Sequence, residues 1–151
     1  MKISVIIPFY NEKELIGRAI DSVFLNELDG FDFEIIIGND GEIDDNCILH
    51  QIKKKYLSYV QIIKNNGAKG PGGARNAALN FATGDLIAFL DADDYWLSGK
   101  LKKQIDLIKN GASFVATGYR FNRGNVTVNP PKEIFFPKDI FKKRGIGTST
   151  I

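Results

Sequence analysis

ISVIIPFYNE, residues 3–12, is the stretch of this sequence that decides the fold class. Ile3 to Ile7 form a short apolar run, and Pro8 ends it. A strand that is apolar along its length is usually covered on both faces, as the inner strands of parallel sheets are. The run therefore predicts a central parallel strand with polar residues at its carboxyl end.

Strand and helix patterns alternate along the rest of the chain. Directly after the first strand, Asn11 and Glu14 have the spacing of a capping box that opens a helix. The expected helices cover residues 12–27, 44–57, 73–83 and 98–110, the expected strands cover residues 3–7, 33–37, 60–63, 85–90 and 113–120, and a hairpin is expected over residues 119–128. Alternation with short links is typical of right-handed β-α-β units. We therefore expect an α/β, Rossmann-like fold with a mostly parallel central sheet flanked by helices.

The composition is that of an ordinary soluble domain. The chain has 151 residues, 44% of them hydrophobic and 25% charged, so it can bury a core without disulfides. Its one cysteine excludes an internal disulfide and a multi-cysteine zinc site. The net charge of +2 (20 basic minus 18 acidic side chains) argues neither for nor against a nucleic-acid partner, and we expect none. No apolar run reaches the roughly 18 residues of a membrane span. No signal peptide is recognisable, so the expected compartment is the cytoplasm.

The pattern changes toward the end of the sequence. Residues 132–144 carry five basic and two acidic side chains (5 − 2 = +3). The lysine-rich part of this segment, residues 138–144, is either a solvated face or a surface for anionic lipid headgroups. Gly147 to Ile151 resemble the start of a strand. We therefore expect residues 1–151 to form a single domain whose C-terminal part continues beyond the sequence.

An acidic cluster follows the fourth predicted strand. Asp91, Asp93 and Asp94 lie so close in sequence that their carboxylates repel one another unless a cation joins them. Mg²⁺ and Mn²⁺ prefer oxygen ligands and often take only one or two from protein and the rest from phosphates and water. The cluster therefore indicates a metal–diphosphate site, with an acidic turn that caps the next helix as the alternative. An EF-hand is excluded because Trp96 stands where such a loop needs glycine.

Two further loops suggest a nucleotide. Asp40, after the second predicted strand, can accept a hydrogen bond from a base N–H or a ribose hydroxyl, although a simple turn is the alternative. The glycine-rich segment 67–76 leads into a helix whose N-terminus attracts anions. It lacks the spacing of a Walker A loop or a dinucleotide fingerprint. Arg75, expected in the first helical turn, is poorly placed for the helix dipole, which favours a ligand contact.

These polar segments all stand at the carboxyl ends of predicted strands. Ligands of parallel α/β sheets bind beyond those ends. The segments 8–11, 39–40 and 91–94 are therefore expected to form one site.

Four stretches in this order resemble the family 2 inverting glycosyltransferases, which have the GT-A, nucleotide-diphosphosugar-binding fold. They are SVIIPFYNE (residues 4–12), NDG (39–41), GARNAAL (73–79) and the stretch from Gly84-Asp85 to Asp94-Tyr95-Trp96-Leu97. Each stretch is only moderately specific, but four of them in the right order and at the right intervals are highly specific.

The resemblance implies a nucleotide-binding role for four residues. Pro8 matches the backbone position that contacts the base. Tyr10, two residues further on, is expected to belong to the same nucleotide-binding site. Asp40 matches the carboxylate that hydrogen-bonds the uracil ring. Arg75 matches the helix arginine near that base. Asn39 departs from the family's usual Asp in this turn, while Asp40 is kept.

The resemblance also implies a metal site at the family's DxD motif. Asp91 and Asp93 match that motif, the first near the ribose and the second on the metal, and both are expected to take part in holding Mn²⁺ or Mg²⁺. Asp94 is the family's usual third acidic residue.

The implied reaction is inverting transfer of a sugar from a nucleotide-diphosphosugar, with a UDP-sugar expected, to an acceptor hydroxyl. The expected acceptors are glycans or lipid-linked glycans of cell-surface polysaccharide synthesis. The enzyme would then work at the inner face of the membrane, with peripheral contact to it. Inverting transfer needs a carboxylate base. Glu133 and Asp139, the acidic residues after position 118, do not match it, so the base is expected beyond Ile151.

There are three alternatives to a glycosyltransferase, and the order of motifs argues against the last two. The chain could bind a nucleotide-sugar without transferring it. A nucleotidyltransferase would place a glycine-rich, arginine-containing loop directly after the first strand, where residues 9–12 read FYNE. A metal-dependent phosphatase would place its acidic cluster after the first strand and not after the fourth.

Overall fold

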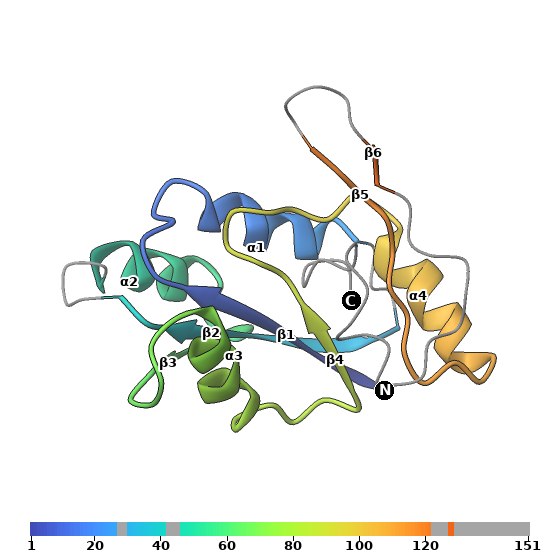
Figure 1. Cartoon of the computed structure of the whole chain (residues 1–151), viewed down its shortest axis with the longest axis horizontal. Helices are drawn as coiled ribbons and strands as arrows, with labels where there is room; N and C mark the ends of the chain where they lie inside the picture. Colours follow the sequence, from blue (N-terminus) through green and yellow to red (C-terminus); the bar gives the residue numbers. More distant parts are fainter. Residues whose placement is uncertain (27–29, 42–45, 122–126, 129–151) are drawn as a thin grey trace.

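The computed structural model describes residues 1–26, 30–41, 46–121 and 127–128. Four parallel strands form the central sheet in the order β3-β2-β1-β4 (Figure 1). The strands are β1 (Lys2–Phe9), β2 (Asp32–Asn39), β3 (Val60–Lys64) and β4 (Leu86–Phe89). The helices are α1 (Ile16–Phe24), α2 (Asn46–Lys55), α3 (Pro71–Leu79) and α4 (Lys100–Lys109). The expected α/β architecture with a parallel central sheet is confirmed.

β1 is an inner strand, as its apolar run predicts. It pairs in parallel with β2 on one side and with β4 on the other, so that Ile6 lies between Ile36 and Phe89. Every residue from Ile3 to Phe9 is buried. Because neighbours cover both edges and helices cover both faces, apolar residues are favoured along the whole strand.

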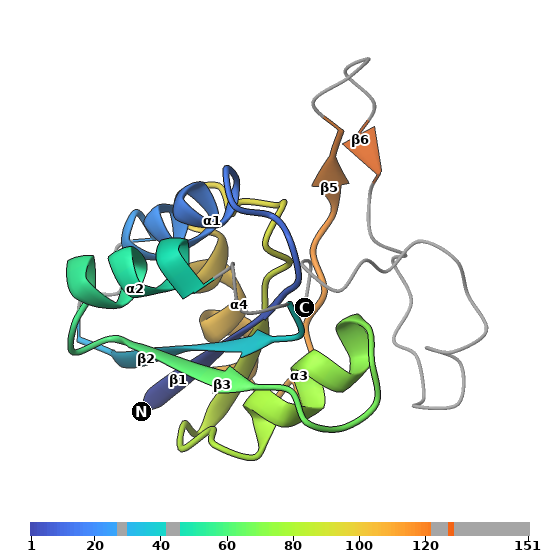
Figure 2. The same ribbon diagram turned by 90° about the vertical axis from the view of Figure 1, so that its left-hand side faces the viewer.

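Helices cover the two faces of the sheet unequally. Figures 1 and 2 show α1 and α2 on one face and α3 on the other. Side chains alternate between the faces along β1. Ile3, Val5, Ile7 and Phe9 join the larger core with residues of α1, α2 and α4, whereas Ile6 packs with Ala78 of α3. None of the helices in the described ranges has the length and apolar character needed to cross a membrane.

Both helices next to the polar loops begin elsewhere than the sequence predicts. α1 begins at Ile16, with Leu15 as its N-cap, so the capping box expected from Asn11 and Glu14 is wrong. Instead, the carboxylate of Glu12 accepts hydrogen bonds from two backbone amides of the loop. α3 begins two residues earlier than expected because Pro71, whose ring fixes φ in the helical range, can occupy its first turn.

The strand expected over residues 113–120 is wrong for most of its length. Only Tyr119–Arg120 (β5) is a strand, and it pairs antiparallel with Thr127–Val128 (β6), which confirms the expected hairpin. The segment before β5 is instead attached to α4, where Gln104 Nε2 donates a hydrogen bond to the Val115 carbonyl oxygen (3.0 Å). The basic stretch 132–144 and the strand expected from Gly147 lie outside the described residues.

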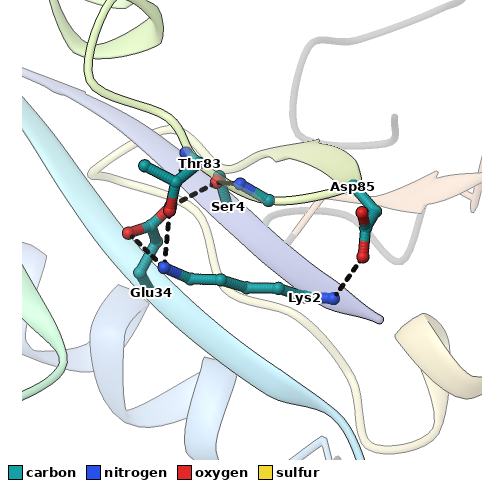
Figure 3. A network of polar contacts seen from close by, with 6 residues as sticks. Lys2, Ser4, Glu34, Thr83 and Asp85 are labelled. Carbon is teal, nitrogen blue, oxygen red and sulfur yellow. Dashed lines mark hydrogen bonds and ion pairs between the residues drawn. The ribbon is translucent and has the colours of Figure 1, made fainter.

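A buried carboxylate joins β1, β2 and the loop before β4 (Figure 3). Glu34 is 6% exposed and accepts hydrogen bonds from Ser4 Oγ (2.6 Å), Lys2 Nζ (2.9 Å) and the Thr83 amide (2.8 Å). Burial raises the pKa of Glu34, but these hydrogen bonds outweigh it and lower the pKa from 4.5 to about 2. The ionised side chain therefore stabilises the folded state.

We expect Glu34→Gln to reduce the free energy of unfolding by about 3 kcal/mol at pH 7. The folded pKa lies below the unfolded value, so the stabilisation is complete above about pH 4.5 and is lost as the pH falls toward 2. The difference between the wild type and Glu34→Gln in urea unfolding should therefore shrink steadily between these two pH values.

Glu14→Gln is the matched control, because Glu14 is an exposed glutamate outside this network. Its unfolding free energy should follow that of the wild type at every pH. A Glu34→Gln difference that stayed constant from pH 7 to pH 2.5 would show that the ionisation of Glu34 is not the stabilising factor.

Candidate functional site

The carboxyl ends of β2 and β4 are both joined to β1 by hydrogen bonds beyond the regular strand pairing. The Asp40 amide, just beyond β2, donates to the Phe9 carbonyl oxygen (2.8 Å). The Leu90 amide, just beyond β4, donates to the Ile6 carbonyl oxygen (3.1 Å). The polar segments that follow β1, β2 and β4 therefore leave the sheet at the same edge (Figure 1).

The two candidates on the first segment differ in exposure. Pro8 is buried within β1, opposite Gly38 of β2. Tyr10 is 59% exposed, and its backbone amide donates to the Glu12 carboxylate (2.9 Å). A ligand at this edge can therefore meet the Tyr10 ring, whereas Pro8 fixes the course of the main chain beneath it.

Asp40 anchors the glycine-rich loop. It is 4% exposed, and its carboxylate accepts hydrogen bonds from Asn65 Nδ2 (2.8 Å) and the Gly70 amide (2.7 Å). Lys69 Nζ lies 3.5 Å from the same carboxylate. Burial raises the pKa of Asp40, but the bonds from Gly70 and Asn65 and the charge of Lys69 outweigh it and lower the pKa. The ionised carboxylate therefore joins the end of β2 to the segment after β3 and to the glycine-rich loop.

Asn65 is a residue of the candidate site that sequence reasoning missed. Its side-chain amide group donates to Asp40 and to the Ala68 carbonyl oxygen (2.8 Å), while its Oδ1 accepts from the Gly67 amide (3.0 Å). Asn65 therefore holds the glycine-rich loop at Gly67 and Ala68 and connects it to Asp40. Its place directly after β3 is the signal that could have identified it, because the other candidate polar residues also follow the ends of strands.

The loop turns so tightly that Gly73 has no room for a side chain. A Cβ on Gly73 would lie 1.6 Å from the Ala68 carbonyl oxygen. Where α3 crosses β2, a Cβ on Gly38 would lie 2.0 Å from the Ala74 carbonyl oxygen. These close approaches hold the start of α3, and hence Arg75, against the ends of the strands.

Arg75 binds Asp91 directly. Its guanidinium donates to the Asp91 carboxylate, and the two side chains are 17% and 28% exposed. Arg75 is the fifth residue of α3, so it lies in the second turn and not in the first as expected. The argument from the helix dipole therefore does not apply to Arg75. The observed partner of its guanidinium is the Asp91 carboxylate. Two residues that are 16 positions apart in sequence are brought together at the site.

Asp93 lies in a group of acidic side chains. Partial burial of the carboxylate, together with the charges of Asp94, Asp91 and Glu12, raises the pKa of Asp93. Asp93 and Asp94 are both exposed. Glu12, on the segment after β1, belongs to this acidic group although its position in the sequence gave no indication of it.

The donor set fits a divalent cation only with help from a ligand. Among the described residues, no three His, Cys, Asp or Glu side chains gather as a ready-made metal site. Asp93 offers exposed carboxylate oxygens that the neighbouring negative charges make favourable for a cation. One or two carboxylates completed by phosphate oxygens is the arrangement in which Mg²⁺ is commonly held.

Comparison with known proteins places the chain among sugar transferases. The model of the family described as glycosyl transferase family 2 matches residues 4–150. The chain is 34% identical over 153 residues to an Escherichia coli protein named UDP-Glc:alpha-D-GlcNAc-diphosphoundecaprenol beta-1,3-glucosyltransferase WfgD. This match covers 99% of the chain and 58% of the E. coli protein. The chain is 39% identical over 119 residues to the poly(ribitol-phosphate) beta-glucosyltransferase of Bacillus spizizenii, which covers 78% of this chain and 19% of that protein.

A solved structure supports the same fold. Residues 1–349 of S. aureus TarS in complex with UDP superpose on the chain with a TM-score of 0.69 at 27% identity. The match covers 83% of this chain and 38% of the TarS chain. The chain thus spans little more than half the length of the E. coli relative and less of the other two proteins.

We expect Gly73→Ala to destabilise the protein by about 2 kcal/mol or more, because a methyl group cannot be accommodated against the Ala68 carbonyl oxygen. Either the loop or the start of α3 must shift. The measurement is the midpoint and slope of urea unfolding, compared with the wild type.

Gly72→Ala is the matched control in the same helical turn. A Cβ on Gly72 would meet nothing within 4 Å. Alanine favours the helix over glycine by about 1 kcal/mol, so this variant should be as stable as the wild type or more stable. Equal losses in the two variants would show that the close approach at Gly73 does not constrain the loop.

Proposed function

The chain belongs to glycosyl transferase family 2, and from that premise we propose that it binds the donor of a sugar-transfer reaction, a nucleotide-diphosphosugar, at the carboxyl edge of its sheet. The observation that carries the proposal is the contact between Arg75 and Asp91. It joins the glycine-rich loop and helix anchored by Asp40 to the acidic loop that bears Asp93. The loop and helix anchored by Asp40 would supply hydrogen-bonding groups for the base of a nucleotide. The acidic loop would hold the cation that balances the charge of its diphosphate.

In this proposal the base and ribose lie between the segments after β1 and β2 and the start of α3. Pro8 and Tyr10 contact the base from one side, and Asp40 accepts a hydrogen bond from it. Arg75 lies near the same base, and its bond to Asp91 fixes both side chains. The UDP bound to S. aureus TarS, a structure with the same fold at 27% identity, supports uridine as the nucleoside.

Asp93 and Asp91 are the proposed ligands of Mn²⁺ or Mg²⁺ in the DxD motif. Partial burial and the neighbouring negative charges raise the pKa of Asp93, and a diphosphate would add further negative charge. A divalent cation at this place would neutralise the charge that develops on the departing nucleoside diphosphate. The chain's own contribution is to hold Asp91 through Arg75, so that the loop after β4 has a fixed course before the donor binds.

The proposed reaction is transfer of the sugar to an acceptor hydroxyl with inversion at the anomeric carbon. The names of the E. coli and B. spizizenii relatives specify a diphosphoundecaprenol-linked sugar and a poly(ribitol phosphate) as their substrates. They support a lipid-linked or polymeric glycan as the acceptor here, in cell-surface polysaccharide synthesis at the inner face of the membrane.

We expect UDP to bind at least tenfold more tightly with Mn²⁺ than without it, and Asp93→Ala to abolish this gain. Isothermal titration calorimetry of UDP into the protein, with Mn²⁺ and with EDTA, measures both constants. Asp93→Ala should retain the weaker, metal-free binding, because Asp40 and Arg75 are unchanged. GDP and dTDP, titrated in parallel, test the preference for uracil.

Asp106→Ala is the matched control, because Asp106 is an exposed aspartate on α4, outside the acidic loop. It should bind UDP and Mn²⁺ as the wild type does. If UDP, GDP and dTDP all fail to bind the wild type, the donor-site proposal is wrong. Binding without release of UDP when nucleotide-sugar and acceptor extracts are supplied would favour a binding module that does not transfer sugar.

A further inference from the structure

Three polar residues of the α1 segment hold the acidic loop and the start of α4. Arg18 Nη2 donates to the Asp93 carbonyl oxygen (2.8 Å). Ser22 Oγ accepts from the Trp96 amide (3.0 Å). Further along, Asn26 Oδ1 accepts from the Leu101 amide (3.0 Å). The three contacts run in parallel along the two segments.

Their spacing explains how one segment makes all three contacts. Arg18, Ser22 and Asn26 are four residues apart, and residues four apart lie on the same face of a helix. Each contact uses the main chain of the opposite segment, between residues 93 and 101. The row therefore fixes the path of this segment, whichever side chains it carries.

The two buried members of the row, Ser22 and Asn26, are each held in one orientation. Ser22 is 4% exposed and Asn26 is completely buried. Ser22 Oγ also donates to the Ala19 carbonyl oxygen (2.6 Å), and Asn26 Nδ2 donates to the Ser22 carbonyl oxygen (2.9 Å). Because both side chains use donors and acceptors together, each can hold only one orientation. These two contacts attach the start of α4 to the core.

Arg18 is the outer member and lies closest to the site. Its guanidinium carbon lies 4.8 Å from the centre of the Tyr95 ring while Nη2 holds the Asp93 carbonyl oxygen. A planar guanidinium can stack on a ring and donate in its own plane at the same time. It holds the main chain of Asp93 and does not occupy its carboxylate, so it does not compete with a cation.

We propose that Arg18 is a positioning residue for the Asp93 carboxylate, and that the row Arg18–Ser22–Asn26 sets the geometry of the acidic loop. The inference rests on the proposed donor site. Metal ligands must be held within a fraction of an ångström, and loss of the groups that orient them weakens metal binding about 10- to 100-fold. Among the described residues, Arg18 makes no hydrogen bond or ion pair with the residues proposed to bind the base. Its effect is therefore specific to the metal-dependent part of binding.

The test is the affinity for Mn²⁺ in the presence of saturating UDP, measured as free Mn²⁺ by electron paramagnetic resonance. Arg18→Ala should weaken Mn²⁺ binding about tenfold. Arg18→Lys should recover part of the loss, because an ammonium can donate to the Asp93 carbonyl oxygen but lacks the planar stack on Tyr95. Affinity for UDP in EDTA should stay within about twofold of wild type in both variants, a readout that a general structural defect would not spare.

Lys54→Ala is the matched control, since it removes an exposed cation from α2, away from the acidic loop. It should bind Mn²⁺ and UDP normally. The inference is overturned if Arg18→Ala binds Mn²⁺ within twofold of wild type, or if it loses metal-free UDP binding to the same extent. A wild-type protein whose UDP binding does not depend on Mn²⁺ would contradict the proposed function itself, and that result is seen before any variant is compared.

Discussion

The parallel pairing of β1 with β2 on one side and β4 on the other is the constraint on which the site depends. It requires the chain to return to the same end of the sheet before each strand, and so it brings every loop that follows a strand to one edge. The Asp40 and Leu90 amides continue this pairing beyond the strands, onto the carbonyl oxygens of Phe9 and Ile6. The loops therefore begin from fixed positions, although they have no regular structure themselves.

The two ends of the sheet use carboxylates in opposite ways. Beside the loop that precedes β4, Glu34 is surrounded by donors, and its pKa falls to about 2. At the carboxyl end, partial burial and the neighbouring carboxylates raise the pKa of Asp93. The first arrangement is complete within the protein and stabilises the fold. In the second, a nearby positive charge would stabilise the ionised form, and perturbed carboxyl groups of this kind are frequent at functional sites.

At the carboxyl end of the sheet, the candidate groups are held by contacts within the protein. Asn65 and the Gly70 amide hold Asp40, Arg75 holds Asp91, and Arg18 holds the main chain of Asp93. The candidate groups are thus arranged before any donor is present. Preorganisation of this kind reduces the free energy that binding must spend on ordering the site.

The sequence by itself determined the alternation of strands and helices, the inner position of β1 and the loops that carry the site. These properties follow from local patterns of apolar residues, glycine and proline, which act over a few neighbouring positions. Local patterns misplaced the start of α1 and α3 and predicted a long strand over residues 113–120, because caps and strand pairing depend on partners elsewhere in the chain. Only the tertiary structure decided that Arg75 meets Asp91, that Asn65 meets Asp40 and that Arg18 meets Asp93, since residues 16 to 75 positions apart are joined by packing and not by spacing.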